Sequence, residues 1–182
     1  MLKKATSLLV LALLPVILAG CGVLGVPAGG LGVNLQPTQL GFELDDAGTI
    51  SIISNSVTFT NRANAAAALV TGYSIRFFDD ADAEIVVDSD LTNVDGLAIA
   101  VPAGYSCPGG ETSECGIGER IPAEQQSDPF PFIFLPSTVA QELVLSGATR
   151  VHAEIAFEAE RGGQSLDWTV LVDVTMPVGG GE

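Results

Sequence analysis

The sequence predicts an all-β domain, an antiparallel β-sandwich of about seven strands with one short helix near residues 138–143. Two observations predict this fold. Apolar and polar residues alternate with a period of two through much of the chain, as in strands with one face on a core and one in water. Turn-forming residues, mainly Gly, Asp and Asn, separate these segments at short intervals. A series of short amphipathic strands favours two packed sheets.

A leader precedes the predicted domain. Lys3 and Lys4 give the start of the chain a positive charge, and residues 8–18 form an unbroken apolar run. This run has the length of the apolar region of a signal peptide and is short for a bilayer span. It ends in a tetrapeptide that resembles the lipobox of bacterial lipoproteins, Leu18-Ala19-Gly20-Cys21.

The lipobox resemblance implies that residues 1–20 are a signal peptide and that the thiol of Cys21 is lipidated. Acyl chains such as palmitate would then anchor the protein to a membrane outside the cytoplasm. Each buried methylene contributes about 0.8 kcal/mol, so two or three chains give a firm anchor. Gly22, and not an aspartate, follows the cysteine. In a bacterium with two membranes, this residue implies an outer-membrane destination.

Charge limits the partners of the mature chain. Removal of residues 1–20 takes away both lysines and leaves five arginines against all 22 acidic residues, a net charge of −17. A strongly acidic chain argues against binding to nucleic acids or anionic membranes, which requires basic patches. The charge favours solubility and leaves cation binding open, although a general bias towards acidic, lysine-poor proteins explains it better than any specific role.

The mature chain is expected to have three parts: a lipidated Gly-rich tether (21–34), the sandwich (35–178) and a flexible tail (179–182). Alternation predicts early strands within residues 38–44, 49–53 and 57–60. A strand at 73–77 is expected to turn at 79–82 and return through 84–87, and residues 97–101 suggest another strand. A closing hairpin is predicted from residues 151–160 and 168–176, joined at Gly162-Gly163. Thr138 and Gln141 have the spacing of a helix capping box.

The region 54–87 and the closing hairpin resemble bacterial immunoglobulin-like or fibronectin-type-III-like envelope domains. The resemblance is one of strand pattern and includes no diagnostic motif. It implies an immunoglobulin-like sandwich without fixing a function.

Cysteine usage predicts one disulfide. Once Cys21 is lipidated, Cys107 and Cys115 remain, and an oxidising compartment favours a bond between them. The spacing of these two cysteines differs from the Cys-x-x-Cys of redox motifs.

An acidic turn is the candidate metal site. Asp79, Asp80, Asp82 and Glu84 crowd one predicted turn, and clustered oxygen ligands are what calcium needs. A solvated acidic turn without metal is the alternative. Apart from calcium, the sequence suggests no cofactor.

Three phenylalanines are the candidate partner surface. Phe130, Phe132 and Phe134 would share one face of an extended segment, and an exposed edge with aromatic side chains can accept another strand. The alternative is a core strand, placed at a sheet edge by Pro131.

The sequence contains no recognisable catalytic motif. The single histidine, His152, falls on the polar face of a predicted strand, and the mature chain has no lysine. We therefore expect a non-catalytic lipoprotein of the cell envelope that acts as an interaction or structural module. Its partner would be an envelope protein or a polysaccharide. The alternatives are a calcium- or carbohydrate-binding lipoprotein and an envelope hydrolase.

Overall fold

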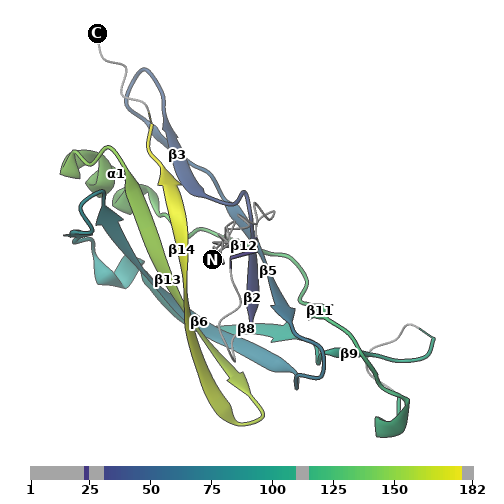
Figure 1. Cartoon of the computed structure of the whole chain (residues 1–182). Helices are drawn as coiled ribbons and strands as arrows, with labels where there is room; N and C mark the ends of the chain where they lie inside the picture. Colours follow the sequence, from purple (N-terminus) through teal and green to yellow (C-terminus); the bar gives the residue numbers. More distant parts are fainter. Residues whose placement is uncertain (1–22, 25–30, 110–114, 178–182) are drawn as a thin grey trace, which may run out of the picture.

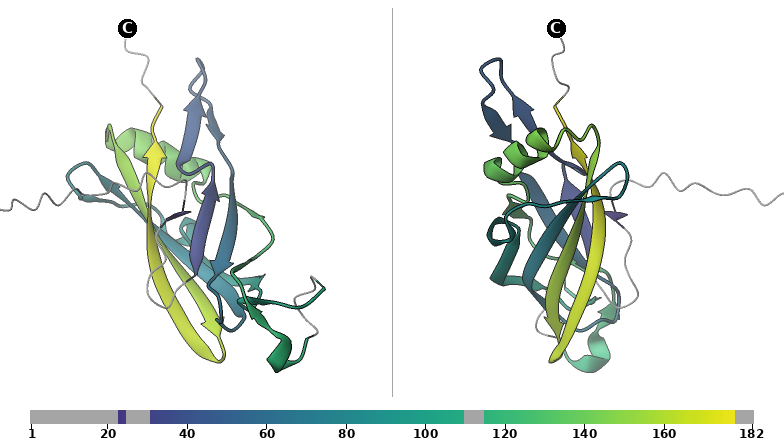
Figure 2. Two further views of the ribbon diagram at one scale, coloured as in Figure 1. Left: turned by 45° about the vertical axis from the view of Figure 1, so that its right-hand side comes forward. Right: turned by 90° about the vertical axis from the view of Figure 1, so that its left-hand side faces the viewer.

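The protein is a β-sandwich of two large sheets (Figures 1 and 2). The computed structural model describes residues 23–24, 31–109 and 115–177. One sheet has five strands in the order β1-β2-β5-β11, with β12 also paired to β5. Its strands are β1 (Val23–Leu24), β2 (Gly32–Gln36), β5 (Asn55–Asn61), β11 (Gln125–Gln126) and β12 (Phe130–Phe132).

The other large sheet has seven strands in the order β4-β3-β14-β13-β6-β7, with β8 also paired to β6. Its strands are β3 (Leu40–Leu44), β4 (Ile50–Ile52), β6 (Ala68–Asp79), β7 (Glu84–Ile85), β8 (Asn93–Val101), β13 (Val151–Arg161) and β14 (Gln164–Thr175). A separate pair joins β9 (Tyr105–Ser106) to β10 (Ile121–Pro122). Short 3-10 turns occupy Ser89–Leu91 and Ile117–Glu119. The all-β sandwich prediction is confirmed.

The strand count exceeds the predicted seven because several strands have only two or three residues. The pairing is antiparallel among the described strands except between β14 and β3, where Val174 lies beside Leu40 in parallel. The chain crosses from β2 in one sheet to β3 in the other, where β3 lies between β14 and the edge strand β4.

β13 lies in the middle of the larger sheet, between β14 and β6, and its buried and outward-facing residues alternate along its length. Ile155 lies opposite Ile75 of β6 on one side and Val170 of β14 on the other. The buried residues of β13 share one face, and the opposite face carries His152 and glutamates. The Gly162-Gly163 turn that follows has positive φ angles of 57° and 80°, as a tight hairpin requires. The predicted closing hairpin is confirmed.

The core between the sheets is built around aromatic rings. Phe59 of the smaller sheet meets Phe157 of the larger one edge to face, with ring centroids 5.3 Å apart. Trp168 stacks on Phe157 at 5.5 Å. Such contacts add specific geometry to the burial of large apolar surfaces.

The helix differs from its prediction at both ends. α1 (Ser137–Ser146) starts one residue before Thr138, and Pro136 occupies the N-cap position without a side-chain cap. The capping box at Thr138 and Gln141 was therefore wrong. Pro136 can hold this position because its carbonyl accepts the hydrogen bond of the Ala140 N–H. Gly147, with φ of 71°, ends the helix in the left-handed conformation.

The domain begins earlier than predicted. Leu31, Val33 and Leu35 are at most 1% exposed, and β2 pairs with β5 from Gly32 onwards. Residues 31–34 therefore belong to the sandwich and not to a tether. The high glycine content of this region hid a strand whose apolar residues alternate. Within the described residues, no helix is long and apolar enough to span a membrane.

Candidate functional site

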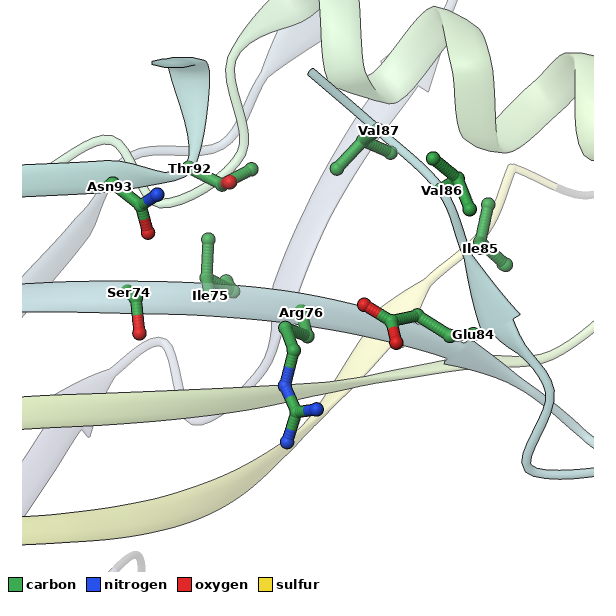
Figure 3. Close-up of a pocket in the computed structure, with 9 residues that line it drawn as sticks. All are labelled: Ser74, Ile75, Arg76, Glu84, Ile85, Val86, Val87, Thr92 and Asn93. Atoms are coloured by element: carbon green, nitrogen blue, oxygen red, sulfur yellow. The ribbon is translucent and has the colours of Figure 1, made fainter. Parts of the chain in front are cut away.

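A notch at the edge of the larger sheet is one candidate site (Figure 3). β6 pairs with β8 as far as Ser74 and with β7 from Phe77, so the edge of β6 changes partner between these residues. The N–H of Ile75 donates to the Thr92 carbonyl at 3.0 Å. The resulting hollow has a volume of about 260 Å³.

The notch has apolar walls and charged groups at one end. Ile85 and Val87 line it beside Ile75 (Figure 3). Arg76 is drawn away from the hollow, because its guanidinium pairs with Glu154 of β13 at 2.6 Å. The described residues that line the notch include no histidine and no cysteine, and Glu84 is the one carboxylate among them. The notch therefore offers mainly apolar surface, with one carboxylate among its lining residues.

The acidic turn lies beside this notch and is used mainly to build the hairpin. The carboxylate of Asp79 accepts hydrogen bonds from the N–H groups of Ala81 and Ala83, both at 2.8 Å. Asp82 takes a positive φ of 58°, and one of its oxygens lies 3.7 Å from His152 Nε2. Such side-chain hydrogen bonds explain the turn without a metal.

The four predicted calcium ligands do not converge in the described structure. Asp80 is exposed, and Glu84 lies along the notch. Among the described residues, no three His, Cys, Asp or Glu side chains are grouped so that they could hold a metal ion. Calcium binding stays a prediction, to be tested by calorimetric titration.

His152 lies on the outer face of β13, as predicted, and is half-buried. Its ring stacks on that of Phe78, with centroids 5.3 Å apart, and Asp82 is its acidic neighbour. These contacts fasten the β6–β7 hairpin onto β13. The same contacts position the His152 ring on the outer face of the sheet.

The predicted aromatic surface is divided by the structure. Phe132 and Phe134 are 5% and 1% exposed, and both contact Tyr73 in the core. Phe130 is 42% exposed. The alternative of a core strand thus describes Phe132 and Phe134, and a partner surface here is restricted to Phe130. The pairing of β12 with β5 places Phe132 opposite the buried Asn55.

The predicted disulfide is confirmed. It joins Cys107 and Cys115, whose Cα atoms are 5.6 Å apart. Cys107 is buried and directly follows β9. The bond holds the segment beyond β9 at one end of the sandwich, here called the loop end, which comprises residues 62–67, 102–109 and 115–124.

Hydrogen bonds join the segments of the loop end, and the sequence analysis did not predict them. The buried Asn61 side chain donates hydrogen bonds to the carbonyls of Ala66 and Pro102, at 2.8 and 2.9 Å. The Gly104 carbonyl accepts hydrogen bonds from Asn64 and Ala123. Three of these four contacts join residues 19–41 positions apart, so no local pattern reveals them.

Leu18–Cys21 and the rest of the leader lie outside the described residues, as does the tail 179–182. No protein-family model and no curated protein matches the chain.

Proposed function

We propose that this protein is a lipid-anchored, extracytoplasmic β-sandwich that acts as a non-catalytic interaction module. The observation that carries the proposal is the tetrapeptide Leu18-Ala19-Gly20-Cys21, which ends the apolar run. Its cysteine lies only ten positions before Leu31, the first core residue whose burial the structure describes. A lipobox of this kind places a lipid just ahead of the folded domain.

Chain length supports a domain held close to the membrane. Ten residues from Cys21 to Leu31 span at most about 35 Å when fully extended. β1 shortens this path, because Val23 already pairs with Asn34. Only Gly22 then separates Cys21 from Val23, the start of β1, a reach of about 7 Å along the chain. The anchor would leave the sandwich near the corner that follows β2.

The loop end lies far from this corner. Thr38, in the corner, lines the same hollow as His152. The Gly162-Gly163 turn is ten residues further along β13, about 33 Å at the rise of an extended strand. Arg161, beside this turn, bonds Asn61 at the loop end. The membrane anchor and the loop end would thus occupy opposite parts of the domain, with the loop end free to meet an envelope partner.

The disulfide also supports an extracytoplasmic location, since such bonds persist in oxidising compartments. Palmitate labelling in a bacterium tests the anchor. The intact chain should incorporate an alkyne-palmitate label and sediment with membranes, whereas Cys21→Ser should lose the label and keep its leader. A Cys107→Ser/Cys115→Ser double variant is the matched control and should still be labelled. An unlabelled intact chain would refute the anchor.

The interaction role has a separate test. A photo-crosslinking amino acid at exposed Ile117, in the loop end, should trap a defined envelope component in intact cells. The control carries the same photo-crosslinking amino acid in place of Val86, which is exposed beside the notch. Equal trapping at both positions, or none at either, would contradict a partner surface at the loop end.

A further inference from the structure

A hollow of about 500 Å³ opens at the loop end, and Tyr105 of β9 is among its lining residues. Four alanines line it, residues 65–67 and Ala103, and they leave space because their side chains are single methyl groups. Tyr105, Ile117 and Arg120 complete most of its rim, and Ile117 is 83% exposed. No carboxylate is among its described lining residues, in a chain that carries 22 acidic residues.

Arg120 supplies the one positive charge of this hollow. Its guanidinium carbon lies 4.3 Å from the centre of the Tyr105 ring, a cation–π contact that orients the group. Within the described parts of the chain, Arg120 makes no ion pair. Arg76 offers a direct comparison: it lies 5.4 Å from the Phe78 ring centre and is neutralised by Glu154.

The walls of the hollow are fixed before any ligand arrives. Asn61 holds the backbone on two sides through Ala66 and Pro102. Gly104 lies so close to Arg62 that an added Cβ would be 1.9 Å from the Arg62 carbonyl oxygen. β9 and β10 pair directly, with Tyr105 opposite Pro122. A preorganised hollow binds with little loss of conformational freedom.

We propose that this hollow binds the C-terminal carboxylate of an extended peptide whose last residues have small apolar side chains. A planar guanidinium can form two parallel hydrogen bonds with a carboxylate. The Asn64 amide, also in the lining, provides a further polar group. The four alanine methyls would pack against short apolar side chains of the peptide.

The lining distinguishes this ligand from others. A sugar acid also carries a carboxylate, but its ring hydroxyls would face alanine methyls and lose hydrogen bonds to water. A polyanion would be repelled at long range by the acidic chain. A peptide terminus needs one strong polar contact and otherwise apolar surface, which is what the hollow offers.

This inference names the partner class of the proposed interaction role but does not depend on the lipid. The test is calorimetric titration of the full chain with N-acetyl-trialanine, its C-terminal amide and glucuronate. We expect the free acid to bind about ten-fold or more tightly than the amide, the factor expected from one lost charge-assisted contact. Tighter binding of glucuronate would overturn the peptide assignment.

Matched variants complete the experiment. Arg120→Ala should weaken binding of the free acid about ten-fold or more, and Arg76→Ala should leave it unchanged. Melting temperatures of both variants should stay near that of the original chain, since both side chains are exposed. The site is refuted if the acid and amide bind equally, if Arg120→Ala binds normally, or if no peptide binds at about 10 mM. Those results would leave the palmitate labelling of Cys21 unaffected.

Discussion

The guanidinium of Arg161 donates a hydrogen bond to the Asn61 Oδ1 atom at 3.1 Å, and this contact joins the two sheets at the loop end. Arg161 ends β13 in the larger sheet, and Asn61 ends β5 in the smaller one. The amide nitrogen of Asn61 donates to the carbonyls of Ala66 and Pro102. One fully buried side chain therefore holds together four segments of the domain.

Replacement of Asn61 by Ala should destabilise the protein strongly. The variant removes two part-buried hydrogen bonds to backbone carbonyls and one to a guanidinium, which we expect to lower the free energy of unfolding by about 2–4 kcal/mol. Urea denaturation measures the change. The exposed Asn93 provides the control, because Asn93→Ala should alter stability by less than about 0.5 kcal/mol. Equal effects of the two substitutions would argue against the network.

Gly104 is required for space and not for an unusual φ angle. A Cβ there would meet the Arg62 backbone, and the hydrogen bonds from Asn64 to Gly104 and from Gly104 to Ala65 fix both chains, at 2.7 and 2.8 Å. Gly104→Ala should therefore lower the free energy of unfolding by at least about 1–3 kcal/mol. Gly118→Ala is the control, since nothing lies within 4 Å of its added Cβ. A fully stable Gly104→Ala variant would contradict the close approach.

The strands of the larger sheet were the most predictable part of the fold. β13 and β14 alternate without interruption, because one face of each packs on the core and the other meets water. β2 was missed since Gly32 and the glycines before it resemble a linker, although Leu31, Val33 and Leu35 alternate as core residues do. In that segment the prediction followed the high glycine content and overlooked the alternation of apolar residues.

The candidate sites were less predictable because distant segments build them. The loop-end hollow combines Asn64, Tyr105 and Arg120, and only the packing of the sheets brings these residues together. The disulfide was predictable, since Cys107 and Cys115 are the two cysteines left after Cys21. In the acidic turn, the Asp79 carboxylate accepts hydrogen bonds from the turn backbone, a role that the run of neighbouring acidic residues did not predict.

The two phenylalanines of β12 should respond differently to truncation. Phe132 stacks on Phe134, with ring centroids 4.8 Å apart, and lies in the core, so Phe132→Ala should lower the free energy of unfolding by about 3–5 kcal/mol. Phe130→Ala removes a ring that is already partly in water and should cost less than about 1 kcal/mol. Thermal or chemical unfolding of the pair checks this. If Phe130→Ala lowered the free energy of unfolding more than Phe132→Ala does, then Phe130 and not Phe132 would be the buried ring.

Tyr73 should make stability depend on alkaline pH. Burial raises the pKa of its phenol above the ordinary value of 10.0, because a phenolate among the core rings would lose its hydration. The phenol thus stays neutral in the folded chain while the unfolded chain ionises near pH 10. This contribution to stability is fully present below pH 10 and is lost as the pH rises above it.

Tyr73→Phe isolates that effect. Phenylalanine keeps the ring contacts with Phe132 and Phe134 but cannot ionise. We expect the free energy of unfolding to fall less steeply above pH 10 in the variant than in the original chain, as measured by urea denaturation at several pH values. The ultraviolet phenolate band should also lose its late-titrating component. If both chains lose stability equally with pH, the Tyr73 hydroxyl is not held in the apolar environment that the structure gives it.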